Sequence, residues 1–295
     1  MTDKTVVILH LKSAALPAVK QAIKTVKKEG HDLRVFVPYG GKEVARIVRE
    51  TLDRGAERII AGGGDGTLNA VVNTIVVAGD DKPDLTFGVF PLGTANDFAR
   101  GCGLPLDDLT QCLRIACSSK GHAVDVGVLN DRNFINVASL GFGAEITATT
   151  TAQLKKALGG AAYTLTGLVK AMNLTPHTGR VLVPGGEDLD GSILFAAVGN
   201  NRYAGGGFEV APLARLDDGL LDLCAIRIDR GIRLASIGQE LNDPMNPDNV
   251  HVNYRQLEDF TIESDRELHC NLDGEPLQTT RLEFHVRPQH LNVAF

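Results

Sequence analysis

Hydrophobic and polar positions follow two alternating patterns over roughly the first 120 residues. Short apolar runs occur at 5–11, 33–37, 58–61 and 86–90, as expected for strands that are buried on both faces. After each run, apolar residues recur at spacings of three and four, which marks one buried face of a helix. These faces comprise Leu16, Val19, Ile23 and Val26; Val44, Ile47, Val48, Thr51 and Leu52; Leu68, Val71, Val72, Ile75 and Val76; and Leu109, Cys112, Leu113 and Ala116. The alternation predicts a parallel, doubly wound, Rossmann-like α/β sheet.

The pattern changes after about residue 123, where short β-rich segments are separated by Gly, Asp and Asn turns. We interpret this part as an antiparallel β-sandwich or a distorted barrel, with one helix between 152 and 172. The sequence thus predicts two domains, 1–123 and 124–285, and residues 286–295 could join the first domain. The predicted strands are 124–129, 134–137, 180–183, 193–198, 220–228, 260–263, 268–272, 282–286 and 291–295.

Composition restricts the partners of this chain. Its 295 residues carry a formal net charge of -6, which argues against a nucleic-acid partner because such proteins usually present a basic face. Contact with an anionic membrane would need a local basic patch, for which Lys155 and Lys156 are the better candidate. Lys24, Lys27 and Lys28 could also form such a patch, but a run of this kind is more often a solvated helix face. No apolar stretch is long enough to span a bilayer. The five cysteines form no CxxC pair, so we expect free thiols in a cytoplasmic protein. The sequence gives no indication of oligomeric state.

The strongest chemical motif is GGGDGT at 62–67, where a predicted strand runs into a predicted helix. Consecutive glycines let backbone N–H groups approach a bulky anion, and the following helix N-terminus adds further donors. Asp65 would repel a bare phosphate, so its presence suggests a metal ion or a proton transfer at this point. Thr67 could cap the helix or contact a phosphate oxygen. The motif favours phosphate binding over a purely structural turn.

A second motif, PLGTANDF at 91–98, follows the next predicted strand. Thr94 and Asn96 could each be a plain helix cap. However, the carboxyl ends of neighbouring parallel strands form the ligand crevice of an open α/β sheet. The two loops together therefore predict one shared nucleotide site.

GGGDGT followed by PLGTANDFAR resembles the catalytic domain of diacylglycerol and sphingosine kinases. Later segments narrow the resemblance to the YegS-like bacterial lipid kinases, and they occur in order over nearly the whole chain. These segments are LGFG at 140–143, ALG at 157–159, GNNRYAGGG at 199–207, DGLL at 218–221 and NLDGEP at 271–276.

The resemblance implies an NAD-kinase-like or phosphofructokinase-like first domain that binds ATP with Mg²⁺, and a β-sandwich domain that takes the lipid, with the site between the two. The substrate would be a hydroxyl-bearing membrane lipid, with phosphatidylglycerol and diacylglycerol both open, reached by a cytoplasmic protein at the inner face of the membrane. The resemblance places on the nucleotide Gly64, Asp65, Gly66, Thr67, Leu68, Asn69, Ala70 and Thr94. The two loops themselves add Gly62, Gly63, Gly93 and Asn96 as nucleotide-binding candidates.

The resemblance also assigns two acidic segments. Mg²⁺ or Ca²⁺ would be held by the carbonyl groups of Arg215 and Leu220 and by the carboxylate of Asp218. Asp273 or Glu275 would supply the catalytic carboxylate, with Asp65 assisting. From the residues alone, Asp273-Gly274 is a good hairpin turn and Asp217-Asp218-Gly219 is a turn by default; neither reading conflicts with chemistry at these loops.

Three positions depart from the family pattern. Ala70 stands where the family usually has Glu, His10-Leu11 replaces Asn-Gly after the first strand, and Pro38 replaces a Thr near the nucleotide. These changes keep open a non-catalytic nucleotide- or lipid-binding regulator as an alternative. The other alternative is an NAD kinase, which also combines GGDGT with two domains.

Overall fold

The computed structural model describes residues 4–78, 84–140, 177–227 and 234–295. The chain forms two compact units. Unit 1 is Met1–Val124 with Gln289–Phe295, and unit 2 is Asp125–Pro288. The predicted helix at 152–172, the ALG segment, Lys155, Lys156 and the LGFG segment beyond Leu140 lie outside the described residues.

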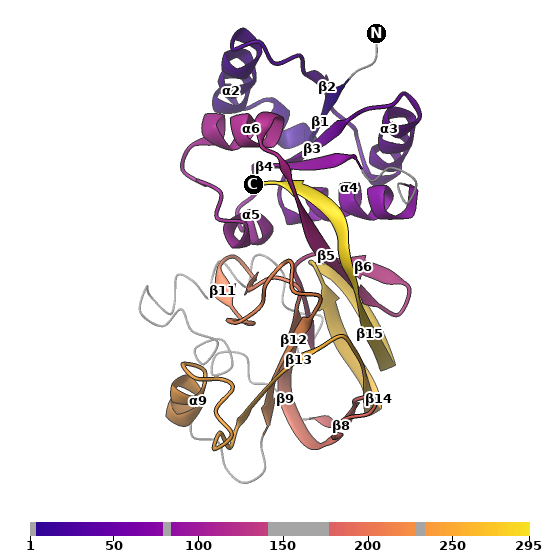
Figure 1. The fold of residues 1–295 in the computed structure, drawn as a ribbon, viewed down its shortest axis with the longest axis vertical. Helices are drawn as coiled ribbons and strands as arrows, with labels where there is room; N and C mark the ends of the chain where they lie inside the picture. The colour runs from indigo at the N-terminus through magenta and orange to yellow at the C-terminus, as the bar shows by residue number, and fades with distance from the viewer. Residues whose placement is uncertain (1–3, 79–83, 141–176, 228–233) are drawn as a thin grey trace. The chain divides into compact units, whose positions relative to one another are not determined.

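Unit 1 is built on a parallel sheet in the order β4-β3-β1-β2. Its strands are β1 (Thr5–Leu9), β2 (Arg34–Phe36), β3 (Arg58–Gly63) and β4 (Thr86–Pro91). Helices α2 and α6 pack against each other on one side of this sheet, and α3 packs against α4 on the other (Figure 1). The helices are α1 (Leu11–Ala14), α2 (Pro17–Lys28), α3 (Gly41–Asp53), α4 (Asp65–Ala78), α5 (Asp97–Gly101) and α6 (Leu109–Ser118). The predicted doubly wound parallel sheet is confirmed.

The predicted helical faces are largely the buried faces. All five apolar or small residues predicted for α3 are buried, as are all five for α4. Ile23 and Leu109 are half-buried, and Leu16 has 48% of its surface exposed. It precedes Pro17, the first residue of α2, and so lies at the N-cap rather than on the packed face.

The end of the chain belongs to the sheet of unit 1. Residues Asn292, Val293 and Ala294 pair in parallel with Thr86, Phe87 and Gly88 of β4. These residues are the end of the long strand β15 (Glu275–Ala294), and the ring of Phe295 then stacks on His122 of strand β5 (Gly121–Leu129) at 4.9 Å. The last residues therefore return to the first unit.

Unit 2 is mainly antiparallel, with pairing in the order β13-β12-β9-β7-β14-β15. In addition, β8 pairs with β14 and β9, and β5 pairs with β15 and β6. Its further elements are β6 (Arg132–Phe134), β7 (Val137–Leu140), β8 (His177–Leu182), β9 (Leu189–Gly199), β10 (Tyr203–Ala204), β11 (Phe208–Glu209), β12 (Leu221–Arg227), α9 (Leu234–Glu240), β13 (Val252–Leu257) and β14 (Asp259–Leu272).

Several of the expected strands have other bounds in the structure. Those expected at 282–286 and 291–295 are parts of one strand, β15. The strand expected at 134–137 is divided into β6 and β7, and Ile135 and Asn136 lie between them. The strands expected at 260–263 and 268–272 are one strand, β14, whose register against β15 shifts between Glu263 and Leu268.

The central strands β9 and β12 are buried on both faces. Ala196 and Leu223 belong to one apolar cluster of unit 2, whereas Phe195 and Cys224, the neighbouring residues, belong to a second cluster. This two-sided burial explains the apolar runs at 193–198 in β9 and 223–226 in β12.

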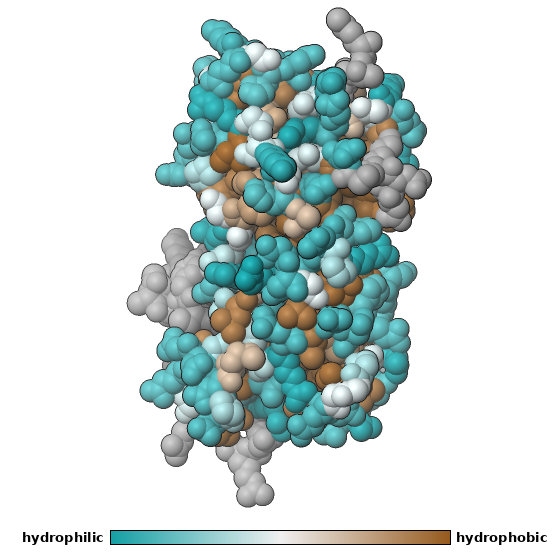
Figure 2. Space-filling model, in the orientation of Figure 1, coloured by the Kyte–Doolittle hydropathy of each residue, from teal (hydrophilic) through white to brown (hydrophobic). Residues whose placement is uncertain are grey.

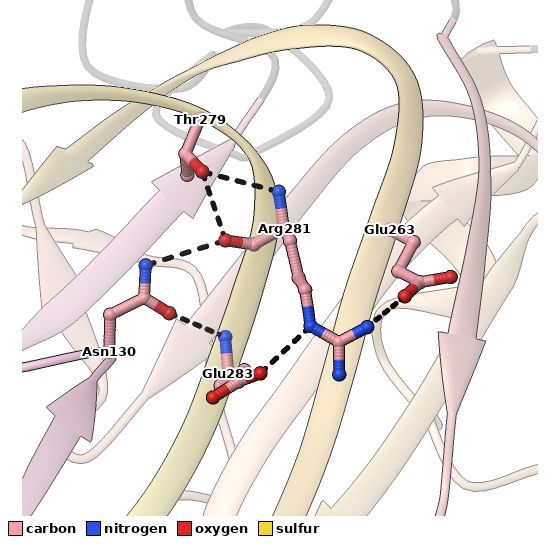
Figure 3. Close-up of polar contacts among 5 residues, drawn as sticks. All are labelled: Asn130, Glu263, Thr279, Arg281 and Glu283. Atoms are coloured by element: carbon pink, nitrogen blue, oxygen red, sulfur yellow. Dashed lines mark hydrogen bonds and ion pairs between the residues drawn. The ribbon is translucent and has the colours of Figure 1, made fainter.

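A polar cluster connects β14, β15 and the turn after β5 (Figure 3). Arg281 of β15 pairs with Glu263 of β14 and, at 2.8 Å, with Glu283. Asn130, in the left-handed conformation at φ 54, accepts a hydrogen bond from the Glu283 N–H at 2.9 Å. Exposed ion pairs contribute little stability. We therefore infer that this cluster mainly fixes the position of the turn after β5 relative to β15, close to the register shift in β14.

Candidate active site

The first glycine loop, residues 62–67, lies at the carboxyl end of β3 and runs directly into α4. A Cβ atom on Gly63 would overlap the Thr67 hydroxyl, and one on Gly62 would lie 2.8 Å from Leu9 Cδ1. Close packing therefore leaves no room for a side chain at Gly63, whereas at Gly62 the Leu9 side chain would have to shift. The His10 N–H donates to the Gly62 carbonyl at 2.7 Å, so the departure from the family pattern at His10 keeps a backbone contact with this loop.

The second loop, residues 91–96, follows β4 and is closed by Asn96. The Asn96 side chain accepts a hydrogen bond from the Gly93 N–H at 2.8 Å and donates one to the Gly93 carbonyl at 2.9 Å. Asn96 itself has the left-handed conformation, with φ 51 and ψ 43, which asparagine tolerates better than most residues. It precedes α5 but makes no side-chain cap to that helix.

The two loops are in backbone contact. The Leu92 N–H donates to the Gly63 carbonyl at 2.8 Å. A Cβ atom on Gly64 would lie 3.1 Å from the Gly93 Cα, and a Cβ on Gly93 would overlap the Gly64 Cα. The glycine backbones can meet only because neither carries a side chain.

Asp65 ties the loops together. Its two carboxylate oxygens accept hydrogen bonds from the N–H groups of Asp97 and Phe98, each at 3.2 Å. The carboxylate therefore satisfies the first amides of α5, as a helix-capping group does. This is a positional role that the sequence did not predict for Asp65.

The other residues predicted to contact the nucleotide differ in how far solvent reaches them. Thr67 lies inside α4 and does not cap it, and Leu68 and Asn69 are buried. Gly66 and Thr94 are exposed, whereas Ala70 is half-buried. The part of the motif that solvent reaches is thus the tip of each loop.

Asp273 occupies the predicted hairpin turn between β14 and β15. Asp273 and Gly274 have φ values of 49 and 97, the left-handed pair that a two-residue hairpin requires. The carboxylate accepts hydrogen bonds from the N–H groups of Ile135 at 2.7 Å, Asn136 at 2.9 Å and Val137 at 3.0 Å. Those amides are turned away from strand pairing, which explains the break between β6 and β7. Glu275, in contrast, lies exposed at the first position of β15.

The predicted cation residues lie in the turn before β12. Within it, the Leu220 N–H donates to Asp218 at 3.1 Å, and Arg215 pairs with Asp217 at 3.3 Å. Asp125, which the sequence did not single out, is fully buried, and its carboxylate accepts the Gly219 N–H at 2.7 Å.

Electrostatics at this turn suit a cation. Burial raises the pKa of the Asp218 carboxyl, and the neighbouring Asp125 carboxylate raises it further. A divalent ion would relieve this repulsion, and the available donors are oxygens, as Mg²⁺ and Ca²⁺ prefer. Among the described residues, no group of three or more His, Cys, Asp and Glu side chains is arranged to hold a metal. A cation here would therefore depend on carbonyl groups as well as on Asp218 and Asp125.

Comparison with known proteins agrees with this architecture. Residues 4–129 match the family model of the diacylglycerol kinase catalytic domain, and residues 136–295 match that of the YegS C-terminal NAD kinase β-sandwich-like domain. A protein of Chromohalobacter salexigens named a probable lipid kinase YegS-like is 45% identical over 275 residues, 92% of this chain and 86% of that protein. The chain belongs to the YegS-like lipid kinase family. Another member with that name, from Pseudomonas fluorescens, is 39% identical and covers 98% of this chain and 94% of its own length.

Solved structures show the same fold. A diacylglycerol kinase candidate from Bacillus anthracis has a TM-score of 0.81 at 20% identity, covering 99% of this chain and 97% of that one. The sandwich, rather than the distorted barrel, is thus the right description of the second domain. Neither the NAD kinase nor the non-catalytic regulator is favoured by these YegS-like relatives. None of the described helices is long and apolar enough to cross a membrane.

One buried carboxyl in this YegS-like chain is poised to titrate. Asp222 on β12 is fully buried; it accepts hydrogen bonds from the Tyr254 hydroxyl at 2.6 Å and from Gln256 at 3.1 Å. Burial raises the pKa of Asp222 to about 6, although both hydrogen bonds oppose the shift. Its second oxygen has no hydrogen-bond partner among the described residues.

The contribution of Asp222 to the free energy of unfolding should therefore fall as the pH rises from about 4 to about 6. In that window the folded chain holds the Asp222 proton and the unfolded chain releases it, so rising pH favours unfolding. The full cost is on the order of 3 kcal/mol, from about two pH units at about 1.4 kcal/mol each. We expect the free energy of unfolding of Asp222→Asn, measured in urea from pH 4 to 7.5, to gain on wild type up to about pH 6 and then to keep a constant difference. Parallel curves for the two proteins would contradict this assignment.

Proposed function

We propose that this chain is an ATP-dependent lipid kinase that transfers the γ-phosphoryl group to a hydroxyl of a membrane lipid. The observation that carries the proposal is the backbone contact of the two glycine loops, at the carboxyl ends of the adjacent strands β3 and β4. Neighbouring strand ends are where open parallel sheets bind nucleotides. The proposal also rests on membership of the YegS-like lipid kinase family.

The two loop tips would hold the phosphates. Gly66 and Thr94 are exposed there, and α4 begins at Asp65. The Thr67 N–H already donates to the Gly64 carbonyl at 2.8 Å, so the amide at the exposed tip is that of Gly66, at the helix N-terminus. Backbone amides of this kind stabilise the charge that spreads over the transferring phosphoryl group. The main role of Asp65 would be to hold the second loop against the first.

Asp273 is our choice for the proton acceptor. As the lipid hydroxyl oxygen bonds to the γ-phosphorus and the bond to the leaving ADP oxygen breaks, the hydroxyl proton would pass to an Asp273 oxygen. The three amide donors hold that carboxylate in one orientation. A strong base is unnecessary, because the transition state of phosphoryl transfer is loose. Glu275, which is exposed, is the weaker choice.

Two cations enter the proposal. Mg²⁺ on ATP would neutralise charge on the β- and γ-phosphates. A second ion, Mg²⁺ or Ca²⁺, would be held by Asp218 with the carbonyl groups of Arg215 and Leu220, and Asp125 adds a second carboxylate beside it. Its contribution would be to fix the turn that precedes β12.

A lipid kinase must also reach a membrane surface. In the view of Figure 2, hydrophilic residues cover most of the surface and apolar residues form separate patches. Unit 1 has a shallow groove of about 560 Å³ with an apolar floor and four lysines. Its lining is Leu9, Ala14, Ile23, Val35 and Val37 with Lys20, Lys24, Lys27 and Lys28. Apolar floor and cationic rim together suit an anionic lipid surface.

Charge reversal in this groove should weaken membrane binding. Each lysine near an anionic surface contributes about 1 kcal/mol, so Lys24→Glu/Lys27→Glu should bind phosphatidylglycerol vesicles at least about 30-fold more weakly in sedimentation. Lys42→Glu/Arg49→Glu makes the same charge change on exposed positions of α3 and serves as the control. Equal losses in both variants would show that net charge, and not this groove, governs binding.

The function itself is tested by phosphoryl transfer from radiolabelled ATP. The purified chain should label a lipid in vesicles that contain phosphatidylglycerol or diacylglycerol, with Mg²⁺ present, and should not label NAD. Label on NAD without label on any lipid would overturn the proposal.

A further inference from the structure

The segment 199–202 is connected to Asp273 through Asn136, and it has no role in the reaction proposed above. Asn200 and Asn201 follow the end of β9 and are 1% and 2% exposed. Their backbone N–H groups both donate to the Asn136 carbonyl, at 2.9 and 3.0 Å. Asn136 is one of the three residues whose amides hold the Asp273 carboxylate. Its peptide groups thus face Asp273 on one side and the two asparagines on the other.

The asparagine side chains continue these contacts. Asn201 donates from its amide to the Asn136 side-chain oxygen at 3.0 Å and accepts the Arg202 N–H at 2.7 Å. Asn200 donates to the carbonyl groups of Ile135 at 3.1 Å and Asp125 at 3.0 Å. Since both acceptors of Asn200 are carbonyls, only its NH₂ group can serve them. Peptide groups that donate on one side and accept on the other strengthen each other's hydrogen bonds.

The same residues reach the turn that precedes β12. The Asp125 N–H donates to the Leu216 carbonyl at 2.6 Å, and the Arg202 guanidinium donates to the Ala214 carbonyl at 3.1 Å. Asn200 bonds Asp125 on one side and Ile135 on the other. A continuous set of hydrogen bonds therefore runs from Asp273, through 135–137 and 200–202, to the turn at 214–220.

The Asn200 side chain carries both a cost and a benefit for stability. The Asn200 side-chain oxygen is buried and has no hydrogen-bond partner among the described residues, and a buried unpaired acceptor destabilises the folded state. A smaller or apolar residue would avoid that cost but would leave the carbonyl groups of Ile135 and Asp125 unpaired. Such local violations are expected where a residue serves the site.

We propose that Asn200 and Asn201 are positioning residues, which fix segment 135–137 so that its amides orient Asp273, and which couple that segment to the turn at 214–220. The inference rests on the proposed function, because it assigns them to the reaction in which Asp273 accepts the proton. Neither asparagine touches the lipid or the nucleotide in this scheme.

The test is Asn201→Ala, assayed for lipid phosphorylation per folded molecule. Misplacement of a catalytic group can cost up to about 10²-fold, so we expect kcat to fall by about 10- to 100-fold with KM for ATP unchanged. Asn136→Ala removes the same side-chain bond from its other partner, and it provides a second variant if Asn201→Ala folds poorly. Phe260→Leu, in the unit 2 core and outside this network, controls for a general loss of stability.

A double-mutant cycle separates positioning from a merely structural role. If Asn201 acts through Asp273, adding Asn201→Ala to Asp273→Asn should cause no further loss of kcat. The same fold-loss in both backgrounds, or a loss in Phe260→Leu equal to that in Asn201→Ala, would overturn the inference. A wild-type chain that labels no lipid would instead refute the proposed function, so the two failures are distinguishable.

Discussion

Asp273→Asn should lower kcat for lipid phosphorylation by roughly 10²- to 10⁴-fold, the usual contribution of a positioned general base. Asparagine preserves the shape of the side chain but cannot accept the hydroxyl proton. It also places an NH₂ group against at least one of the three amide donors that now bond the carboxylate. Replacing one charge-assisted bond with facing donors should cost about 2 kcal/mol, so a lower melting temperature should accompany the loss of activity.

The matched control is Asp265→Asn, an exposed aspartate on the same strand, β14. It should retain wild-type kcat and melting temperature. If Asp273→Asn keeps wild-type kcat although its melting temperature falls, the Asp273 carboxylate is structural only. Glu275 would then be the acid to test next.

Gly93→Ala should weaken ATP binding by about 10²-fold, because the new methyl group overlaps the Gly64 Cα and comes within 2.9 Å of the Asn96 side-chain oxygen. Backbone atoms cannot rotate aside as a flexible side chain can, so the second loop must move away from the first. That movement also lengthens the bonds from Asp65 to the first amides of α5. Isothermal titration with a non-hydrolysable ATP analogue measures the loss directly.

Gly41→Ala is the control for this variant. Gly41 is the first residue of α3, and no atom lies within 4 Å of a Cβ built there. It should leave ATP affinity unchanged, since alanine is a better helix former than glycine. Equal affinity of Gly93→Ala and wild type would exclude the loop contact from nucleotide binding.

The sequence predicts the first unit more completely than the second. Buried parallel strands and amphipathic helices each leave a strong periodic pattern, so the faces of α3 and α4 could be assigned residue by residue. The short pair β10–β11 and the strand β13 were missed. Val252–Leu257 alternates between buried and half-buried positions without a long apolar run.

The sequence did not predict which segments pair when they are far apart in the chain. Nothing local in residues 292–294 indicates that they pair with β4, some 200 residues earlier. Likewise, the run 134–137 has the apolar character of one strand, but a side chain 136 residues or more away captures the amides of Ile135, Asn136 and Val137. The local preference of these residues for one strand is overridden by the Asp273 carboxylate, which accepts hydrogen bonds from their amides.

The candidate site was predicted in its motifs and not in its internal connections. The glycine loops and the acidic turns were recognisable because glycine and aspartate at strand ends have a limited set of uses. The capping of α5 by Asp65 and the contacts of Asn200, Asn201 and Asp125 depend on which loops meet. The contacts of Asn200 and Asn201 had only a weak sequence signal, namely two consecutive asparagines directly after an apolar strand.

The account depends on the nucleotide phosphates lying against the backbone of both glycine loops. A crystal structure of the chain with Mg²⁺ and a non-hydrolysable ATP analogue tests this most directly. We predict that the triphosphate contacts backbone N–H groups of both 62–67 and 91–96, close to Gly66 and Thr94. A triphosphate bound away from these two loops would contradict the account.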